Sequence, residues 1–254
     1  MAGLLSVEGL TRSFYGVHAL NGAAFTVAPG SITGLIGPNG AGKTTVFNCI
    51  SGVIPPETGR VTFDGTEITG WRPDQISLRG LVRTFQIARG FPKLTVFETL
   101  LLHGDKQPGE HVGNALFRPG RWMKRERELA DRAREVARRL KLDHVLTNMS
   151  ADLSGGQKKL LEIGRALMGR PKLILLDEPV AGVNPTLGRE IAERIRELAE
   201  EGLTFLIVEH DMALVAELCD TVIVMAEGTT LVEGTFDEVT SDTRVQDAYL
   251  GRRT

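Results

Sequence analysis

The sequence predicts an α/β fold with a mainly parallel sheet, an antiparallel β part near the N-terminus and an inserted helical segment. Short apolar strands alternate with helical stripes of apolar residues, which is typical of parallel sheets. A glycine-rich stretch at residues 37–42 joins a buried strand directly to a helix. Residues 121–142 are densely charged, with apolar residues at helical spacing, which indicates a helical insertion between two halves of the sheet.

The N-terminal region contains strand and turn signals. Residues 4–8 and 23–28 alternate apolar and polar side chains, as half-buried strands do. The Asn-Gly pair at 21–22 and the Pro-Gly pair at 29–30 predict turns. Residues 32–36 predict a buried strand that runs straight into the glycine-rich stretch.

This glycine-rich stretch predicts a phosphate-binding loop. Residues 37–44 match Gly-x4-Gly-Lys-[Ser/Thr] at every position, and residues 43–50 predict the helix that follows. Glycines let backbone N–H groups curl around a polyphosphate, and the helix N-terminus adds positive dipole. Lys43 would reach the β- and γ-phosphates, and the Thr44 hydroxyl would ligate Mg²⁺. A chance glycine-rich turn is the alternative, which the strand–loop–helix context disfavours. The predicted nucleotide-binding residues are Gly37, Pro38, Asn39, Gly40, Ala41, Gly42, Lys43, Thr44 and Thr45.

The middle of the chain differs in character. Residues 104–120 are rich in Gly, Pro and polar residues and predict a loop. The basic stretch 121–141 allows two interpretations, a face for anionic lipid headgroups or a solvated helix face with i,i+4 ion pairs. The apolar face of this helix comprises Leu129, Ala133, Val136 and Leu140, and the expected ion pairs are Glu128–Arg132 and Glu135–Arg139.

The α/β pattern resumes after residue 158. Residues 160–168 carry a helical stripe, and the Asn-Pro pair at 184–185 predicts the start of a further helix. Residues 203–208 predict a buried strand. Segments 221–225 and 229–233 flank a Glu-Gly pair, which predicts a hairpin.

Two acids end another buried strand. Residues 173–176 are apolar and lead directly into Asp177 and Glu178. Because the carboxyl ends of strands in α/β sheets border the ligand crevice, we expect both side chains there. Asp177 suits Mg²⁺, and Glu178 suits a general base that polarises the attacking water. Solvated acids at a strand end are the alternative, which the phosphate loop disfavours.

A second anion site is predicted at Leu-Ser-Gly-Gly-Gln, residues 153–157. Ser154 is a good helix cap, and the glycines leave N–H groups bare. One chain needs only one phosphate cradle unless the second serves another subunit's nucleotide. The residues predicted to contact that nucleotide are Ser154, Gly155, Gly156 and Gln157.

With these motifs in this order, the chain resembles the ATP-binding-cassette (ABC) ATPases over almost its whole length. These are P-loop NTPases with a RecA-like core. Residues 153–157 match the family's signature, and Gln86 matches its glutamine loop. Residues 180–185 match the D-loop, with Asn184 at the usual Asp place. His210 matches the switch histidine, which contacts the γ-phosphate. In isolation, Gln86 would be a surface residue and His210 a satisfied polar residue at a strand end.

The resemblance also implies further roles. Phe14 would stack on adenine, although it could also be a core residue, and Tyr15 is the second candidate. The implied catalytic residues are Glu178, His210 and Lys43, and the implied Mg²⁺ ligands are Thr44, Gln86 and Asp177.

Within the family, the chain looks most like the ATPase subunits of branched-chain amino acid importers. The motifs at 34–45, 209–212 and 248–251 carry this likeness. Many members of that subfamily replace one signature glycine, whereas this chain keeps both. Urea, amide or lipopolysaccharide transport remain alternatives. More remote are a non-transport ABC ATPase acting on ribosomes or DNA and a regulatory module without catalysis.

The resemblance implies a single ABC ATPase domain. Residues 1–86 and 171–254 would form the ATP-binding core, and about 87–170 the helical subdomain. Two such domains, identical or related, would sandwich two ATP molecules, and opening would reach two membrane permease subunits through Gln86 and residues 87–98. A substrate-binding protein would act indirectly, and the subunit would lie peripherally at the cytoplasmic face of the membrane.

Composition fits this interpretation. The 254 residues are 42% hydrophobic and 24% charged with a net charge of −2, which gives no reason to expect nucleic acid. The apolar runs are strand-length, far below the ~20 residues of a spanning helix. We therefore expect separate chains to supply the pore. The N-terminus shows no secretory signal, and Cys49 and Cys219 are expected to be reduced thiols.

Overall fold

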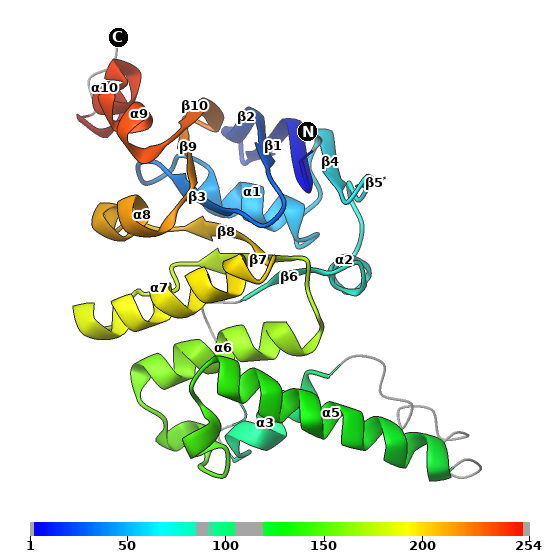
Figure 1. The fold of residues 1–254 in the computed structure, drawn as a ribbon. Coiled ribbons are helices and arrows are strands. Elements are labelled where there is room, and N and C mark those ends of the chain that lie inside the picture. Colours follow the sequence, from blue (N-terminus) through cyan, green and yellow to red (C-terminus); the bar gives the residue numbers. More distant parts are fainter. Residues whose placement is uncertain (1–2, 85–90, 92, 105–118, 251–254) are drawn as a thin grey trace. The chain divides into compact units, whose positions relative to one another are not determined.

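The computed structural model describes residues 3–84, 91, 93–104 and 119–250 (Figure 1). The chain divides into two compact units. The first contains Met1–Arg83, Lys172–Pro179 and Ile195–Thr254, and the second Thr84–Pro171 and Val180–Arg194. Segment 180–194 thus groups with the second unit, where Leu187 packs against Gly156, and not with the core as the sequence division has it.

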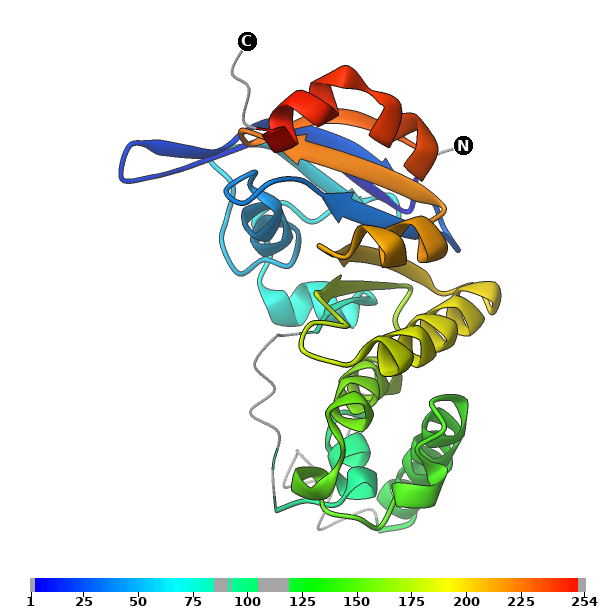
Figure 2. The same cartoon turned by 90° about the vertical axis from the view of Figure 1, so that its left-hand side faces the viewer.

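An antiparallel sheet forms the N-terminal part of the first unit, with strand order β2-β1-β4-β5. Its strands are β1 (Leu5–Phe14), β2 (Val17–Val27), β4 (Thr58–Phe63) and β5 (Thr66–Glu67). β1 and β2 are joined at Tyr15 and Gly16, whose φ angles of 49° and 84° suit a two-residue hairpin turn. Figure 2 shows this blue hairpin extending well beyond the rest of its sheet.

The turn predicted at Asn21–Gly22 is wrong, because β2 continues through both residues. Leu10 pairs with Ala23 across the hairpin. The next residue, Thr11, pairs with Asn21, so Gly22 is the extra residue of a β-bulge. Its φ of 95° explains the glycine. The Asn-Gly pair therefore marks a positive-φ position, but this position belongs to a β-bulge within a strand and not to a turn.

The second sheet is mainly parallel, which confirms the predicted fold class. Its strand order is β10-β9-β3-β8-β7-β6, with only β10 antiparallel to its neighbour. The predicted hairpin is confirmed, since β9 and β10 flank Glu227 and Gly228, both at positive φ. The strands are β3 (Ile32–Ile36), β6 (Leu81–Arg83), β7 (Leu173–Asp177), β8 (Thr204–Val208), β9 (Thr221–Ala226) and β10 (Thr229–Gly234).

Helices complete the first unit. Its main core combines α1 with both sheets, for example Phe47 with Phe63 and Leu206. A second core joins α8, α9 and α10 to the parallel sheet around Val215 and Val224. The helices are α1 (Lys43–Ile50), α2 (Pro73–Leu78), α8 (Met212–Leu218), α9 (Phe236–Ser241) and α10 (Thr243–Leu250). Cys49 and Cys219 are free thiols, and burial raises their pKa to about 11 and about 12.

The second unit is helical. The predicted apolar helix face is confirmed, since Leu129, Ala133 and Val136 of α5 are buried together with Leu140, which directly follows it. α5 packs against α3 and α6. The elements are α3 (Val96–Leu102), α5 (Pro119–Arg139), η2 (Asp143–Val145), η3 (Ser150–Asp152) and α6 (Gly155–Met168), with residues 185–194 of α7 (Pro185–Glu200). Most of the predicted 104–120 loop lies outside the described residues.

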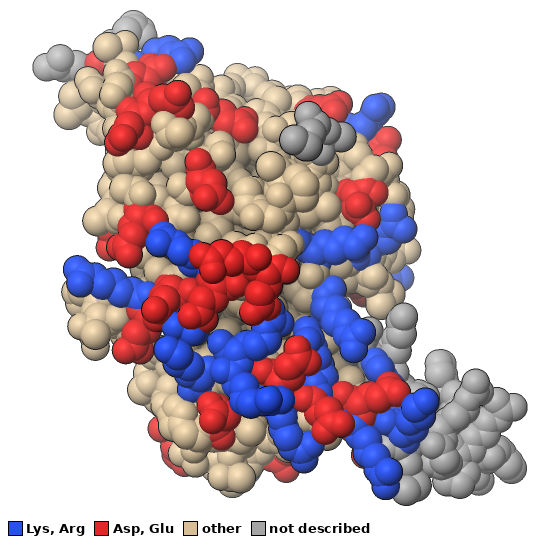
Figure 3. All heavy atoms as spheres, viewed as in Figure 1, with Lys and Arg blue, Asp and Glu red and all other residues tan. Residues whose placement is uncertain are grey.

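Charges of both signs mix over α5 (Figure 3). Three ion pairs there have i,i+3 spacing, at Arg125–Glu128, Arg132–Glu135 and Asp131–Arg134. The predicted i,i+4 pairing of Arg132 with Glu128 is therefore wrong, because Arg132 turns to Glu135 and also donates to the Leu167 carbonyl at 3.0 Å. Within the described part of the chain, no helix combines the length and apolarity that a membrane crossing requires.

Candidate functional site

The phosphate loop lies between β3 and α1 in the first unit. The Lys43 ammonium donates hydrogen bonds to the carbonyls of Gly37 at 2.7 Å and Pro38 at 3.0 Å. Lys43 is only 6% exposed, and burial lowers its pKa against the opposing attraction of Glu178 and Asp177. The loop thus folds around its own lysine, the group that would bind phosphate oxygens.

Two loop glycines are required by close backbone approach as well as by conformation. A Cβ at Gly37, whose φ is 147°, would lie 2.1 Å from the Met225 carbonyl oxygen. A Cβ at Gly42, whose φ is 101°, would lie 2.6 Å from the Ala19 carbonyl oxygen. Gly40 has φ 83° but no neighbour within 4 Å, so only its backbone angle favours glycine. Neighbouring strands therefore fix the loop's shape through its glycines.

The acids predicted for this site end β7 at the carboxyl edge of the parallel sheet. Asp177 is the last residue of β7. Glu178 follows with φ 50°, a left-handed conformation that costs about 1–3 kcal/mol for a non-glycine residue. Its N–H donates to the Val208 carbonyl at 2.9 Å, which holds this geometry. Such strain is typical of functional positions, where it aims a side chain.

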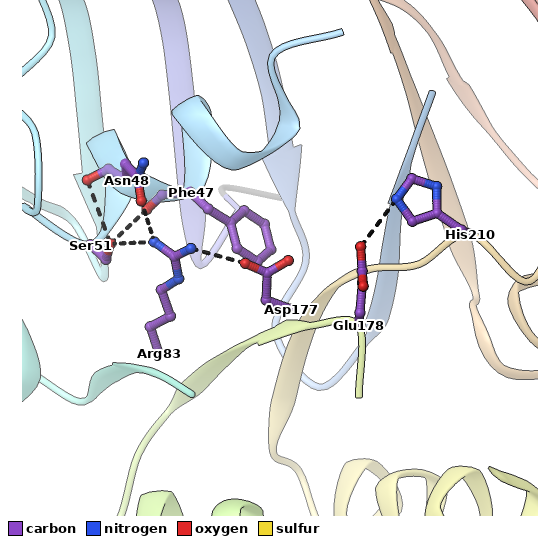
Figure 4. A network of polar contacts seen from close by, with 7 residues as sticks. All are labelled: Phe47, Asn48, Ser51, Arg83, Asp177, Glu178 and His210. Atoms are coloured by element: carbon purple, nitrogen blue, oxygen red, sulfur yellow. Dashed lines mark hydrogen bonds and ion pairs between the residues drawn. The ribbon is translucent and has the colours of Figure 1, made fainter. Parts of the chain in front are cut away.

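His210 reaches the same place from the end of β8. Its Nε2 lies 3.2 Å from Glu178 Oε1 (Figure 4). The preceding Glu209 is 5% exposed, and its carboxylate accepts the backbone N–H groups of His210 at 3.0 Å and Asp211 at 3.5 Å. Sequence reasoning assigned no role to Glu209. An acid directly after a buried strand and before the histidine is the signal that could have found it.

Arg83 at the end of β6 is a second residue beside the predicted site to which sequence reasoning assigned no role. Its guanidinium donates to Asp177 Oδ2 at 3.0 Å and to Asn48 Oδ1 at 2.6 Å (Figure 4). The Arg83 and Asp177 side chains are 8% and 11% exposed. Nothing in sequence spacing relates Arg83 to Asp177, since they meet only because β6 and β7 are paired.

The predicted second anion site lies in the second unit, where Ser154 is the N-cap of α6. Ser154 Oγ accepts the Gln157 N–H at 3.3 Å, and Gln157 Oε1 accepts the Ser154 N–H at 3.0 Å. This reciprocal capping box confirms the predicted cap. Gly155 has open space around it, whereas a Cβ at Gly156 would lie 2.3 Å from Leu187.

Of the other residues singled out in the sequence, the structure describes Phe14, Tyr15 and Asn184. Phe14 is half-buried beneath Arg12, whose guanidinium lies 5.1 Å from its ring centroid, while Tyr15 is fully exposed at the hairpin tip. Asn184 Oδ1 accepts the Leu187 N–H at 2.9 Å, which confirms the predicted cap of α7. Gln86 lies outside the described residues.

The oxygen donors of the first unit suit Mg²⁺. Thr44 is exposed in the first turn of α1, and Asp177 supplies a carboxylate. The described residues contain no group of three or more His, Cys, Asp or Glu that could hold a metal. Because Mg²⁺ usually takes one or two protein oxygens together with substrate phosphates and water, this sparse donor set fits it.

The chain is similar to a known protein family, to named relatives and to solved structures. The ABC transporter family profile matches residues 20–181. The chain is 43% identical over 248 residues to the probable branched-chain amino acid transport ATP-binding protein LivG of Archaeoglobus fulgidus, covering 98% of this chain and 95% of that protein. It is 38% identical to the high-affinity LivG of Escherichia coli K12 over 249 residues, 98% of each chain. The crystal structure of the ADP conformation of an ABC transporter ATP-binding cassette matches with TM-score 0.86 and 39% identity, covering 99% of this chain and 100% of that chain.

Proposed function

Because the chain belongs to the ATP-binding proteins of ABC transporters, we propose that it powers uptake of branched-chain or other small amino acids through separate membrane subunits. As a member of this family the chain is an ATPase. The observation that carries the site assignment is the convergence of Lys43, Glu178 and His210 in the first unit.

The geometry supports a mechanism based on positioning and charge. Phosphoryl transfer requires mainly in-line placement and stabilisation of charge on the transferred group. Lys43 Nζ would exchange its two carbonyl partners for β- and γ-phosphate oxygens. Glu178 would accept the proton of the attacking water, and His210, which faces Glu178, would contact the γ-phosphate. The backbone strain at Glu178 supports this role, because it holds the carboxylate at the edge of the sheet.

Bound Mg²⁺ would neutralise charge on the phosphate oxygens. Thr44 and Asp177 would hold it, and Gln86 is a third proposed ligand. Phe14 or Tyr15 would stack on adenine. The exposure of Tyr15 at the tip of the hairpin favours it as a platform for a flat ring.

We propose that two ABC ATPase subunits, identical or related, share two ATP molecules. Each nucleotide would lie between residues 37–45 of one subunit and 154–157 of the other. The open space at Gly155 supports this arrangement, because a phosphate can approach the N-terminus of α6 there. The nucleotide would then bridge the subunits, and hydrolysis would release them.

The transported substrate is proposed from the relatives, whose names specify branched-chain amino acids. The partners would be two permease subunits and, indirectly, a substrate-binding protein, with this chain peripheral at the cytoplasmic face of the membrane. Urea, amides or lipopolysaccharide are the alternative substrates. Purifying the chain with its membrane partners and screening ligands on the binding protein distinguishes these substrates. Leucine, isoleucine or valine as the tightest ligands would support the proposal, and urea or a lipid would contradict it.

Glu178→Gln tests the catalytic assignment. The change keeps side-chain size but removes the base, a contribution typically worth about 10²–10⁴ in rate. We expect phosphate release to fall by that factor, while ATP binding measured by calorimetry stays at the wild-type value. Glu190→Gln, an exposed acid on α7, serves as the control and should retain full activity. Near-normal turnover of Glu178→Gln would exclude Glu178 as the base.

A further inference from the structure

A buried guanidinium connects the helix after the phosphate loop to the strand that carries Asp177. Arg83 donates to Asp177 Oδ2 through one terminal nitrogen, and through the other to Asn48 Oδ1 and, at 3.4 Å, to Ser51 Oγ. It also lies 5.6 Å from the centroid of the Phe47 ring (Figure 4). Phe47 and Asn48 lie on α1, Ser51 is its C-cap, and Asp177 ends β7, so a single side chain spans both elements.

The two elements joined by Arg83 carry the two proposed Mg²⁺ ligands of this unit. Asn48 lies four residues after Thr44 on α1, and side chains at that spacing share one helix face. Asp177 is held directly by Arg83 through one carboxylate oxygen, which leaves the other outside this ion pair. Residues that hydrogen-bond a metal ligand set its orientation and tune metal affinity.

We propose that Arg83 is a positioning residue for Mg²⁺. Its planar fork fixes Asp177 relative to the helix that bears Thr44, so that both oxygens meet the ion at the distances that near-octahedral Mg²⁺ demands. This inference rests on the proposed function, since it concerns the same site.

An electrostatic role and a positioning role of Arg83 have opposite effects on Mg²⁺ affinity. A cation beside Asp177 repels a divalent ion, so a purely electrostatic role would oppose Mg²⁺ binding. A fork that orients Asp177 would favour it. Lysine keeps the positive charge, but as a single point charge it does not reproduce the two-sided contact of arginine. Arg83→Lys therefore removes the geometry and keeps the charge.

The experiment compares nucleotide binding with and without Mg²⁺ in the full chain. A fluorescent ADP is titrated in EDTA, and Mg²⁺ is then titrated at fixed nucleotide. For Arg83→Lys we expect the Mg²⁺ concentration at half-saturation to rise about tenfold, the lower end of what loss of such a supporting residue costs. Nucleotide affinity in EDTA should stay at the wild-type value, because the phosphate loop itself is unchanged.

Two further variants control the result. Arg60→Lys makes the same change in an exposed ion pair with Glu67 and should behave as wild type. Asn48→Ala removes the shortest contact of Arg83 to α1, at 2.6 Å, but keeps Asp177 paired with Arg83, and should also weaken Mg²⁺ binding. It carries the test if Arg83→Lys does not fold.

Suppose that the wild type binds Mg²⁺ and nucleotide. An unchanged or lower Mg²⁺ concentration at half-saturation in the folded variants would then overturn the inference. Equal losses with and without Mg²⁺ would also overturn it, because they would indicate a general structural role. Failure of the wild type to bind nucleotide would contradict the proposed function itself.

Discussion

The conformation of the phosphate loop predicts a large stability cost for Gly42→Ala. The backbone φ of 101° is unfavourable for any residue with a Cβ, at a cost of about 1–2 kcal/mol. The new Cβ would also lie 2.6 Å from the Ala19 carbonyl oxygen and 3.0 Å from a Leu20 methyl group. Such overpacking adds about 1–3 kcal/mol. We therefore expect the free energy of unfolding to fall by about 2–5 kcal/mol, a large part of the roughly 5–15 kcal/mol typical of a domain.

Urea unfolding followed by circular dichroism measures this loss, and Gly40→Ala is the matched control. Gly40 has φ 83° with no atom within 4 Å of a Cβ, so we expect only the conformational cost of about 1–2 kcal/mol. Gly155→Ala, with open space and no positive φ, should be close to neutral. If Gly42→Ala destabilised the protein no more than Gly40→Ala, the reasoning from steric approach would be refuted.

Two further predictions concern Lys43 and Glu209. Lys43→Ala should weaken ATP binding by about 1.5–3 kcal/mol, the typical worth of a hydrogen bond to a charged group, and an unchanged dissociation constant by calorimetry would count against the phosphate-loop assignment. Glu209→Ala leaves the His210 and Asp211 N–H groups without this acceptor, so we expect unfolding to become easier by about 1–3 kcal/mol and hydrolysis to slow at unchanged ATP affinity. Wild-type turnover in that variant would exclude a role for Glu209 in placing His210.

Much of the first unit could be predicted because its signals are local. β3 and α1 occur at the predicted residues, since a buried strand, a glycine-rich loop and the helix that follows it each leave their own pattern. The hairpin of β9 and β10 was predictable for the same reason, because Glu227 and Gly228 supply the two positive-φ positions that its turn needs.

Features that depend on contacts between distant segments could not be predicted. The Asn21–Gly22 pair has turn chemistry, but β2 continues because Asn21 N–H donates to the Gly228 carbonyl at 2.8 Å, more than two hundred residues later in sequence. Arg83 meets Asp177 only through the pairing of β6 with β7. Sequence spacing carries no information about such meetings.

The choice of ion pairs on α5 also escaped prediction. Both i,i+3 and i,i+4 partners are available on a helix surface. Arg132 takes Glu135 because its other terminal nitrogen is held by the Leu167 carbonyl of α6, a tertiary contact. The helix itself was predictable from its buried stripe, because that pattern is periodic along the chain.

The central claim is that two ABC ATPase subunits share ATP between the phosphate loop of one and the residues 154–157 of the other. The most direct test is the mass of the Glu178→Gln protein by light scattering, with and without Mg²⁺ and ATP. We predict a monomer without nucleotide and a stable dimer with ATP, which dissociates when Ser154 is also changed to Arg. If this chain pairs with itself, a protein that binds ATP yet keeps the monomer mass would contradict the shared site. Mixing this protein with the related subunit applies the same test to a dimer of two different subunits.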